Sequence, residues 1–393
     1  MLKKIRIKNY KSIRDEITVD FSATKYTMLR KENVYNSVVK GALFAGGNAT
    51  GKSNILFSIS VLLDLLFANL QIDMPQFCLF SNDNSMLLEY TFVFDGDCIV
   101  YSLTINKKGT IDLEQLYLND ELLLDRKKLN AETKLTEAKK YDRTTIDEKT
   151  LFLKNIYFNT KFTSFPILQK WFMFLQNSVY FNAERKQVFP PSPNVVSYNK
   201  NNRVTIREYL DNNDVHEINR FLSEFGFNQQ IEYSSSQKLS QFAAVQIAGA
   251  KEIFFKRNDL NISMPIGWES MGNQTLVDML PGLLQVTKEG GMFIVDEFSS
   301  AFHNELEELI VRYFMRNSED AQMFFVSHST NLMKSTLLRP DQIYAVDFSN
   351  DRGSKIKRFS SEGPRESQNM EKMYLSGIFG GLPHLNQESF DGV

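Results

Sequence analysis

The stretch Gly46-Gly47-Asn48-Ala49-Thr50-Gly51-Lys52-Ser53 matches the pattern G-x-x-x-x-G-K-[ST] at every defined position. It follows a short apolar run, residues 38–45, and precedes an apolar segment, residues 52–69. We therefore expect a buried strand before the loop and a helix after it. Backbone N–H groups in such a loop and the helix N-terminus point at negative charge, so the pattern predicts a phosphate-binding loop. The alternative, a chance glycine turn, is not favoured because the strand–loop–helix context is also present.

The residues of this loop have separate expected roles. Lys52 is predicted to neutralise the β- and γ-phosphates of ATP, and the Ser53 hydroxyl to ligate Mg²⁺. The remaining residues are expected to surround the phosphates, and they are Gly46, Gly47, Asn48, Ala49, Thr50, Gly51 and Asn54.

A second segment, residues 292–297, ends in two carboxylates. Four apolar residues precede Asp296 and Glu297, which is typical of a buried central strand. We expect Asp296 to hold Mg²⁺ beside the phosphate loop and Glu297 to orient and polarise the attacking water. The alternative is a strand that merely ends in two acids at a solvent edge. The phosphate loop in the same chain favours the catalytic interpretation.

A third segment, residues 322–328, is an apolar strand that ends at His328, about thirty residues after the two carboxylates. A lone histidine is more often structural than catalytic. Its position at the end of the next expected strand instead favours a sensor of the γ-phosphate.

The pattern of strands and helices predicts a mixed α/β fold. Apolar and polar residues alternate at 4–8 and 17–21, and three further strands are expected within 87–124. Together these predict an antiparallel β-subdomain from about 1–30 and 87–124. Parallel strands that carry the three phosphate-site segments form the expected core.

We divide the chain into residues 1–124 and 266–393, the two parts of one ATPase domain, and an insertion at 125–265. The insertion is expected to be mainly helical, with helix or loop at 125–150, helical spacing at 150–175 and one helix around 205–225. Strand character returns at 251–266. This insertion is the candidate region for recognising a partner or a trigger.

Composition narrows the class of protein. Lys and Arg total 45 against 47 Asp and Glu, so no basic excess indicates a nucleic-acid partner. The most apolar stretch, residues 55–70, is interrupted by Asp64 and is too short to span a membrane. The N-terminus is charged and lacks a signal-peptide pattern, and Cys78 and Cys98 form no CxxC motif. We expect a soluble, cytoplasmic protein with no membrane partner.

The order of the phosphate loop, residues 268–274, Asp296-Glu297 and His328 resembles an ABC-type ATPase. More narrowly, the chain resembles the AbiLi/RloA-like group of bacterial phage-defence ATPases, which is related to the ATPase half of overcoming-lysogenisation-defect nucleases. Further stretches that match this group are 7–13, 51–54, 179–185, 296–303, 339–344 and 374–383. The last of these, Tyr374-Leu-Ser-Gly-Ile-Phe-Gly-Gly-Leu-Pro383, is the most specific to the group.

The resemblance implies that two copies form an ATP sandwich, as a homodimer or higher homo-oligomer. In such ATPases, the signature segment of one subunit caps the nucleotide of the other, and here Ser270 and Gly272 would reach the γ-phosphate across the interface. Met271 replaces the usual glycine of transporters, and Ala301, Phe302 and Asn304 depart from the usual residues around His303. Candidates for the glutamine of the metal-sensing loop are Gln71, Gln76 and Gln187. Hydrolysis of ATP to ADP and phosphate is expected to be slow.

Three functions compete. The first is a sensor or regulator subunit of an anti-phage abortive-infection system that controls a separate effector, a nuclease or toxin. About sixty residues follow His328 without an acidic metal cluster, so the destructive activity is expected in that partner. The second is a DNA repair or recombination clamp. It is favoured by the basic residues near the N-terminus, which could contact DNA: Lys3, Lys4, Arg6, Lys8 and Lys11. The third, a transporter subunit, is disfavoured because the signature is weak.

Overall fold

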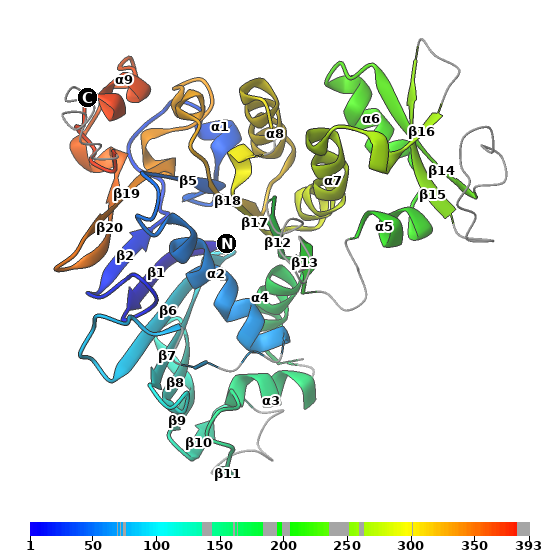
Figure 1. The fold of residues 1–393 in the computed structure, drawn as a ribbon. Helices are drawn as coiled ribbons and strands as arrows, with labels where there is room; N and C mark the ends of the chain where they lie inside the picture. The colour runs from blue at the N-terminus through cyan, green and yellow to red at the C-terminus, as the bar shows by residue number, and fades with distance from the viewer. Residues whose placement is uncertain are drawn as a thin grey trace, which may run out of the picture.

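A computed structural model describes residues 1–68, 70, 72–73, 76–135, 144–159, 162, 164–183, 195–198, 205–235, 251–258, 263–300 and 302–382. Two large sheets organise these residues, and smaller elements project from them (Figure 1). The helices are α1 (Arg30–Asn33), α2 (Lys52–Phe67), α3 (Phe152–Asn159), α4 (Pro166–Gln176), α5 (Ile206–Asn212), α6 (His216–Glu224), α7 (Met271–Glu289), α8 (Asn304–Asn317) and α9 (Met370–Leu375).

The central sheet has the strand order β13-β12-β17-β18-β5-β19-β20. Its inner strands run parallel and its two edge strands run antiparallel. The strands are β5 (Gly41–Ala45), β12 (Val179–Asn182), β13 (Val195–Ser197), β17 (Gly291–Asp296), β18 (Ala321–Val326), β19 (Ile343–Ser349) and β20 (Gly353–Arg358).

Both faces of the central sheet are covered, which explains why its strands read as continuous apolar runs. Ala42 and Phe44 of β5 belong to one hydrophobic core with residues of α2 and α4. Leu43 and Ala45 belong to a second core with residues of α7 and α8. The carboxyl ends of β5, β17 and β18 therefore meet at one edge of a rigid, two-sided layer.

The second large sheet is antiparallel, with the order β11-β10-β9-β8-β7-β6-β1-β2. As predicted, Ile5 and Ile7 lie on one buried face of β1, and β1 pairs with β2 in the register Ile5↔Val19. The strands are β1 (Leu2–Lys8), β2 (Ile17–Asp20), β6 (Ser85–Phe94), β7 (Asp97–Asn106), β8 (Ile111–Leu118), β9 (Glu121–Lys127), β10 (Asn130–Thr133) and β11 (Thr144–Thr145).

The helix or loop predicted for residues 125–150 is wrong at 125–127, 130–133 and 144–145, where strands form, whereas residues 146–150 are loop as predicted. Strands β9, β10 and β11 extend the antiparallel sheet past the expected limit at residue 124. The charged residues of this stretch misled the prediction, because an antiparallel edge can face solvent and tolerate them. Within it, buried Arg126 forms an ion pair with buried Glu114 at 3.5 Å.

The predicted helical insertion at 125–265 is likewise more mixed than expected. Strand β12 lies inside the central sheet beside β17, and α3 and α4 contribute to the main core. Beyond α7, Figure 1 shows a projecting unit of α5, α6 and the small sheet β14 (Gln229–Ser235), β15 (Lys251–Arg257) and β16 (Ser263–Pro265). Two short helices replace the single helix predicted around 205–225. Residues 184–194 and 236–250 of this insertion lie outside the described residues.

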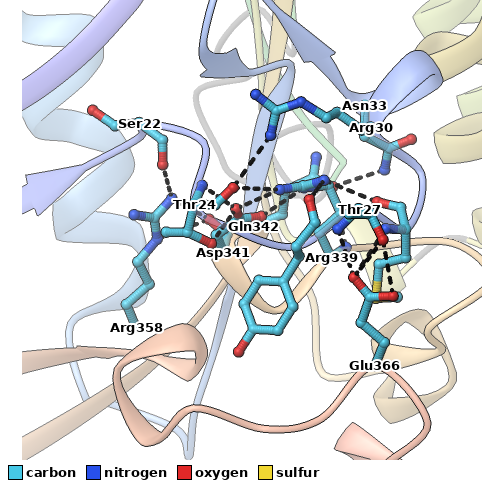
Figure 2. A network of polar contacts seen from close by, with 12 residues as sticks. Ser22, Thr24, Thr27, Arg30, Asn33, Arg339, Asp341, Gln342, Arg358 and Glu366 are labelled. Atoms are coloured by element: carbon cyan, nitrogen blue, oxygen red, sulfur yellow. Dashed lines mark hydrogen bonds and ion pairs between the residues drawn. The ribbon is translucent and has the colours of Figure 1, made fainter.

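The N-terminal segment is tied to the end of the central sheet by a polar network around Arg339 (Figure 2). Arg339 and Asp341 form a fully buried ion pair at 2.8 Å. Arg339 also donates to the carbonyls of Tyr26 and Met28, and the N–H and hydroxyl of Thr24 both donate to Asp341 at 2.7 Å. The two-stranded sheet of β3 (Val34–Tyr35) and β4 (Val38–Val39) follows this network and leads into β5.

Candidate functional site

The predicted phosphate loop connects β5 to α2. Buried Lys52 at the start of α2 folds back into the loop, where its Nζ donates to the carbonyls of Gly46 at 3.1 Å and Gly47 at 2.7 Å. Thr50 is also buried and donates its hydroxyl to the Gly47 carbonyl at 3.0 Å. The loop therefore holds a cation at its centre through its own carbonyls.

Only glycine fits at position 51. Its φ is +98°, and an added Cβ would lie 2.1 Å from Ser354 Oγ and 2.5 Å from Ser12 Oγ. Those two hydroxyls brace the loop from outside: Ser12 Oγ accepts from Asn54 Nδ2 at 2.6 Å, and Ser354 Oγ donates to the Thr50 carbonyl at 2.7 Å. The N-terminal stretch 7–13 thus contacts the phosphate loop directly.

Burial of the charged Lys52 ammonium costs desolvation free energy, and a bound anion would offset that cost. Burial lowers the pKa of Lys52, and the carboxylates of Glu297 and Asp296 offset that lowering in part. A charged ammonium in a partly desolvated site gains strongly from an opposite charge. Bound phosphate groups provide that charge, so the loop suits a polyanionic ligand.

The second predicted segment brings its first carboxylate to this loop. Asp296 ends β17 and is buried. Ser53 Oγ donates to Asp296 Oδ1 at 2.9 Å, and the amide of Asn182 and the hydroxyl of Tyr180 lie 3.3 and 3.4 Å from Asp296 Oδ2. Parallel pairing of β12 with β17 places Asn182 opposite Asp296.

Glu297 is held in an uncommon backbone conformation, with φ of +55°. Such a conformation costs of order 1–3 kcal/mol for a residue other than glycine and persists where the surrounding structure enforces it, often at functional sites. Its N–H lies 3.2 Å from Asp296 Oδ1, and its carbonyl accepts from Ser300. The turn separates the two acids, so that Asp296 faces Ser53 while half-buried Glu297 lines the open cavity.

A cavity of about 780 Å³ lies over the loop. His328, two residues after the end of β18, is exposed on the wall of this cavity, and its backbone N–H donates to Ser299 Oγ at 3.0 Å. The lining residues are Asn48, Ala49, Gly51, Lys52, Ser53, Asn54, Glu297, Ser299, Ser300 and His328. A cavity of this size accommodates a nucleotide.

The predicted site residues therefore fall into three groups. Most of the loop, Glu297 and His328 line the cavity, whereas Gly46, Gly47, Thr50 and Asp296 support it from behind. Ser270 and Gly272 are not on the cavity wall but at the N-terminus of α7. There the Ser270 hydroxyl accepts from the Asn273 N–H at 3.3 Å, and Met271 and Trp268 are 51% and 65% exposed.

The donor set at the loop fits Mg²⁺ that is bound together with phosphates. A hydroxyl and a carboxylate lie side by side in the Ser53–Asp296 pair, and Mg²⁺ typically uses one or two protein oxygens besides phosphate oxygens and water. Ser53 and Asp296 are thus the residues that could hold the ion.

Several residues of the site escaped the sequence prediction. Ser299 and Ser300 line the cavity, Ser12 braces the loop, and Tyr180 and Asn182 contact Asp296. The signals were present in the matched stretches 7–13, 179–185 and 296–303. Of the candidates for the metal-sensing glutamine, Gln76 is not a lining residue, and Gln71 and Gln187 lie outside the described residues.

A family model described as "AAA domain, putative AbiEii toxin, Type IV TA system" matches residues 42–334. The chain belongs to this AAA-domain family. The matched range contains the phosphate loop, both carboxylates and His328. No match was found among curated proteins.

Solved structures similar to this AAA-domain chain include two SMC head domains. The head domain from Thermotoga maritima has 16% identity and a TM-score of 0.48, with 90% of this chain and 97% of that chain covered. The head domain with an extended coiled coil from Pyrococcus furiosus, bound to the C-terminal domain of ScpA, has 13% identity and a TM-score of 0.49, with 96% and 99% covered. The family match and the parallel central sheet with its phosphate loop give the chain the fold of a mixed α/β P-loop ATPase.

Proposed function

We propose that this chain binds ATP with Mg²⁺ and hydrolyses it to ADP and phosphate. The carrying observation is the Ser53–Asp296 hydrogen bond, which joins a hydroxyl on the wall of the cavity, next to Lys52, to a buried carboxylate behind that wall. When bound, Mg²⁺ neutralises charge that develops on the phosphates. Lys52 exchanges its two loop carbonyls for phosphate oxygens, which relieves the cost of its burial.

The remaining steps fall to Glu297 and His328. Glu297 orients a water molecule and accepts one of its protons while the water oxygen bonds to the γ-phosphorus and the bond to ADP breaks. His328 contacts the γ-phosphate. The strained turn at Glu297 sets the direction in which its side chain leaves the backbone, on the wall of the cavity.

We infer further that the active assembly contains two copies. Ser270 and Gly272 sit at an exposed helix N-terminus that does not line the cavity of their own chain. A helix N-terminus favours negative charge, and exposed Trp268 and Met271 flank it. A second copy that presents this terminus to the γ-phosphate completes the charge stabilisation that one chain lacks.

For the biological role, we propose a sensor or regulator subunit of a bacterial defence system that controls a separate effector, a nuclease or toxin. The family description, which names a toxin and a type IV toxin–antitoxin system, supports this setting. The projecting unit of α5, α6 and β14–β16, within residues 125–265, is the proposed region for recognition of the partner or trigger. We place the protein in the cytoplasm. Among the described residues, no helix has the length and apolar composition needed to cross a membrane.

A DNA-binding clamp is the second candidate, and the structure weakens the feature that favoured it. On the first strand, Arg6 forms ion pairs with Glu16 and Glu89, both at 2.9 Å, and Lys8 pairs with Asp83 at 2.8 Å. Carboxylates thus neutralise two of the five basic residues that favoured this candidate. Salt-dependent binding of DNA by the wild-type protein would restore this candidate.

Phosphate release from ATP tests the enzymatic proposal. We expect slow, Mg²⁺-dependent turnover by the wild type and loss of turnover in Glu297→Gln, with ATP binding retained. Glu224→Gln, an exposed acid on α6, is the matched control and should hydrolyse ATP like the wild type. Equal turnover in Glu297→Gln and the wild type would exclude Glu297 as the base.

A further inference from the structure

The C-terminal stretch that is most specific to the phage-defence group contacts the phosphate loop. The Gly47 N–H donates to the Gly381 carbonyl at 2.8 Å. The hydroxyl of Tyr374, which is buried at the end of α9, donates to the same carbonyl at 3.1 Å. One carbonyl therefore connects α9 to the loop that surrounds Lys52.

The contact fixes the orientation of one peptide group. In a trans peptide, the carbonyl and the N–H of the same plane point in opposite directions. The carbonyl of Gly46 accepts from Lys52 Nζ at 3.1 Å, while the N–H of Gly47 points outward to Gly381. The peptide between Gly46 and Gly47 is thus held from inside by the ammonium and from outside by the C-terminal stretch. When phosphates take over the ammonium, the outer contact to Gly381 still holds this peptide.

The stretch is itself held in place. Gly381 has φ of +75°, and an added Cβ would lie 3.2 Å from the Val346 carbonyl oxygen and 3.3 Å from Ala345 Cβ on β19. Phe379 stacks on Phe359 with ring centroids 3.7 Å apart. Ahead of α9, Glu366 accepts hydrogen bonds from the backbone N–H groups of Thr27 and Met28 (Figure 2).

The same stretch also reaches the other side of the site. Glu371 of α9 accepts from Thr330 Oγ1 at 2.6 Å. Thr330 begins the short 3-10 helix Thr330–Met333, two residues after His328. Residues 370–381 therefore touch the loop that carries Lys52 and the loop that follows His328, from one continuous element.

We propose that residues 370–381 act as a positioning element of the ATP site. Gly381 and Tyr374 fix the Gly46–Gly47 peptide and so preorganise the loop for ATP. Glu371 fixes the loop after His328 and so affects turnover. This inference rests on the proposed ATP binding. Its residues do not touch the cavity, so their effect passes through Gly47 and Thr330.

Two alanine variants with the same backbone strain test the role of Gly381. Gly226, in the turn after α6, also has φ of +75°, and nothing lies within 4 Å of its added Cβ. Gly381→Ala is expected to weaken ATP binding, measured by titration calorimetry, about tenfold, the scale of one lost hydrogen bond in a preorganised site. Gly226→Ala should lower Tm but leave the Kd for ATP unchanged. Equal Kd values in both variants and the wild type would overturn the proposal.

Smaller changes separate the contact to the phosphate loop from the contact to the loop after His328. Tyr374→Phe removes one hydroxyl and should raise the Kd for ATP several-fold with little change in Tm. Glu371→Ala, which removes the acceptor of the Thr330 hydroxyl, should lower turnover without changing that Kd. If Tyr374→Phe lowers Tm and leaves Kd and turnover as in the wild type, the stretch is merely structural and the proposal is wrong. Absence of ATP binding by the wild type would instead contradict the proposed function.

Discussion

The Ser53 hydroxyl donates a 2.9 Å hydrogen bond to Asp296 Oδ1, although 243 residues separate the two in the chain. The bond links the start of α2 to the end of β17 across the central sheet. It brings together the two protein oxygens proposed to hold Mg²⁺.

Removal of either partner should uncouple ATP from Mg²⁺. Ser53→Ala and Asp296→Asn are each expected to reduce ATP turnover about a hundredfold or more, the scale of losing one electrostatic contact to the transition state. Addition of Mg²⁺ should no longer strengthen ATP binding in a fluorescence titration. Ser58→Ala is the control, because Ser58 is a buried serine on the same helix whose hydroxyl donates to the Ile55 carbonyl, away from the site. Undiminished Mg²⁺ dependence in both variants would argue against this metal site.

The phosphate loop should not accept a side chain at position 51. Gly51→Ala forces the new Cβ to within 2.5 Å of Ser354 and Ser12 at φ of +98°, so we expect ATP binding to be lost. Gly96→Ala, at φ of +95° with nothing within 4 Å of the added Cβ, carries similar strain away from the site. Calorimetric titration of both variants with ATP distinguishes the clash from the strain. A normal Kd in Gly51→Ala would contradict the loop geometry.

The buried Arg339–Asp341 pair predicts a pH-dependent stability. Burial alone raises the pKa of Asp341, but hydrogen bonds from Arg339 and Thr24 outweigh it and leave that pKa below its usual value. A lowered folded-state pKa stabilises the fold above the unfolded value of about 3.9 and loses this effect as the pH falls through the folded value.

Asp341→Asn leaves Arg339 buried without its counter-charge and should reduce the free energy of unfolding by about 3 kcal/mol at pH 7. Urea titrations should show the gap to the wild type narrowing below about pH 4. Glu121→Gln, in the exposed pair with Lys134, should have no measurable effect. A gap that does not change with pH would mean that the carboxylate charge is not what stabilises this network.

If each ATP site combines residues of two copies, two inactive variants should complement each other. Lys52→Ala should lose ATP binding, and Ser270→Arg should bind ATP without completing the site of its partner. In a mixed dimer, one site combines the intact Lys52 of one copy with the intact Ser270 of the other. Mixing the two proteins should therefore restore turnover that neither shows alone. Persistent inactivity of a verified mixed dimer would indicate that Ser270 does not act across an interface.

The sequence was sufficient for the elements whose residues are constrained by chemistry or by burial on both faces. The loop at Gly46–Ser53, the strand ending at Asp296 and the strand just before His328 could be predicted, because each combines a continuous apolar run with polar residues at or just after its carboxyl end. The alternation of Ile5 and Ile7 likewise predicted β1.

The remaining features depend on contacts between residues that are far apart in the sequence, so local patterns could not predict them. Strand β12 reads as an ordinary apolar segment, and only its parallel register with β17 places Asn182 beside Asp296. Strands β9 and β10 carry many charges and a local pattern that does not distinguish an exposed sheet edge from a loop. The contact of Gly381 with Gly47 joins residues over 300 positions apart and leaves no periodic signal.

The most direct test of the ATP-sandwich mechanism is the assembly mass of the wild type and Glu297→Gln, measured by light scattering after chromatography with and without Mg-ATP. We predict that Glu297→Gln with Mg-ATP elutes as a stable dimer or larger assembly. This variant binds ATP but lacks the base for the hydrolysis that would open the assembly. The wild type should show this mass only transiently. If ATP binds but changes the mass of neither protein, the sandwich mechanism is wrong.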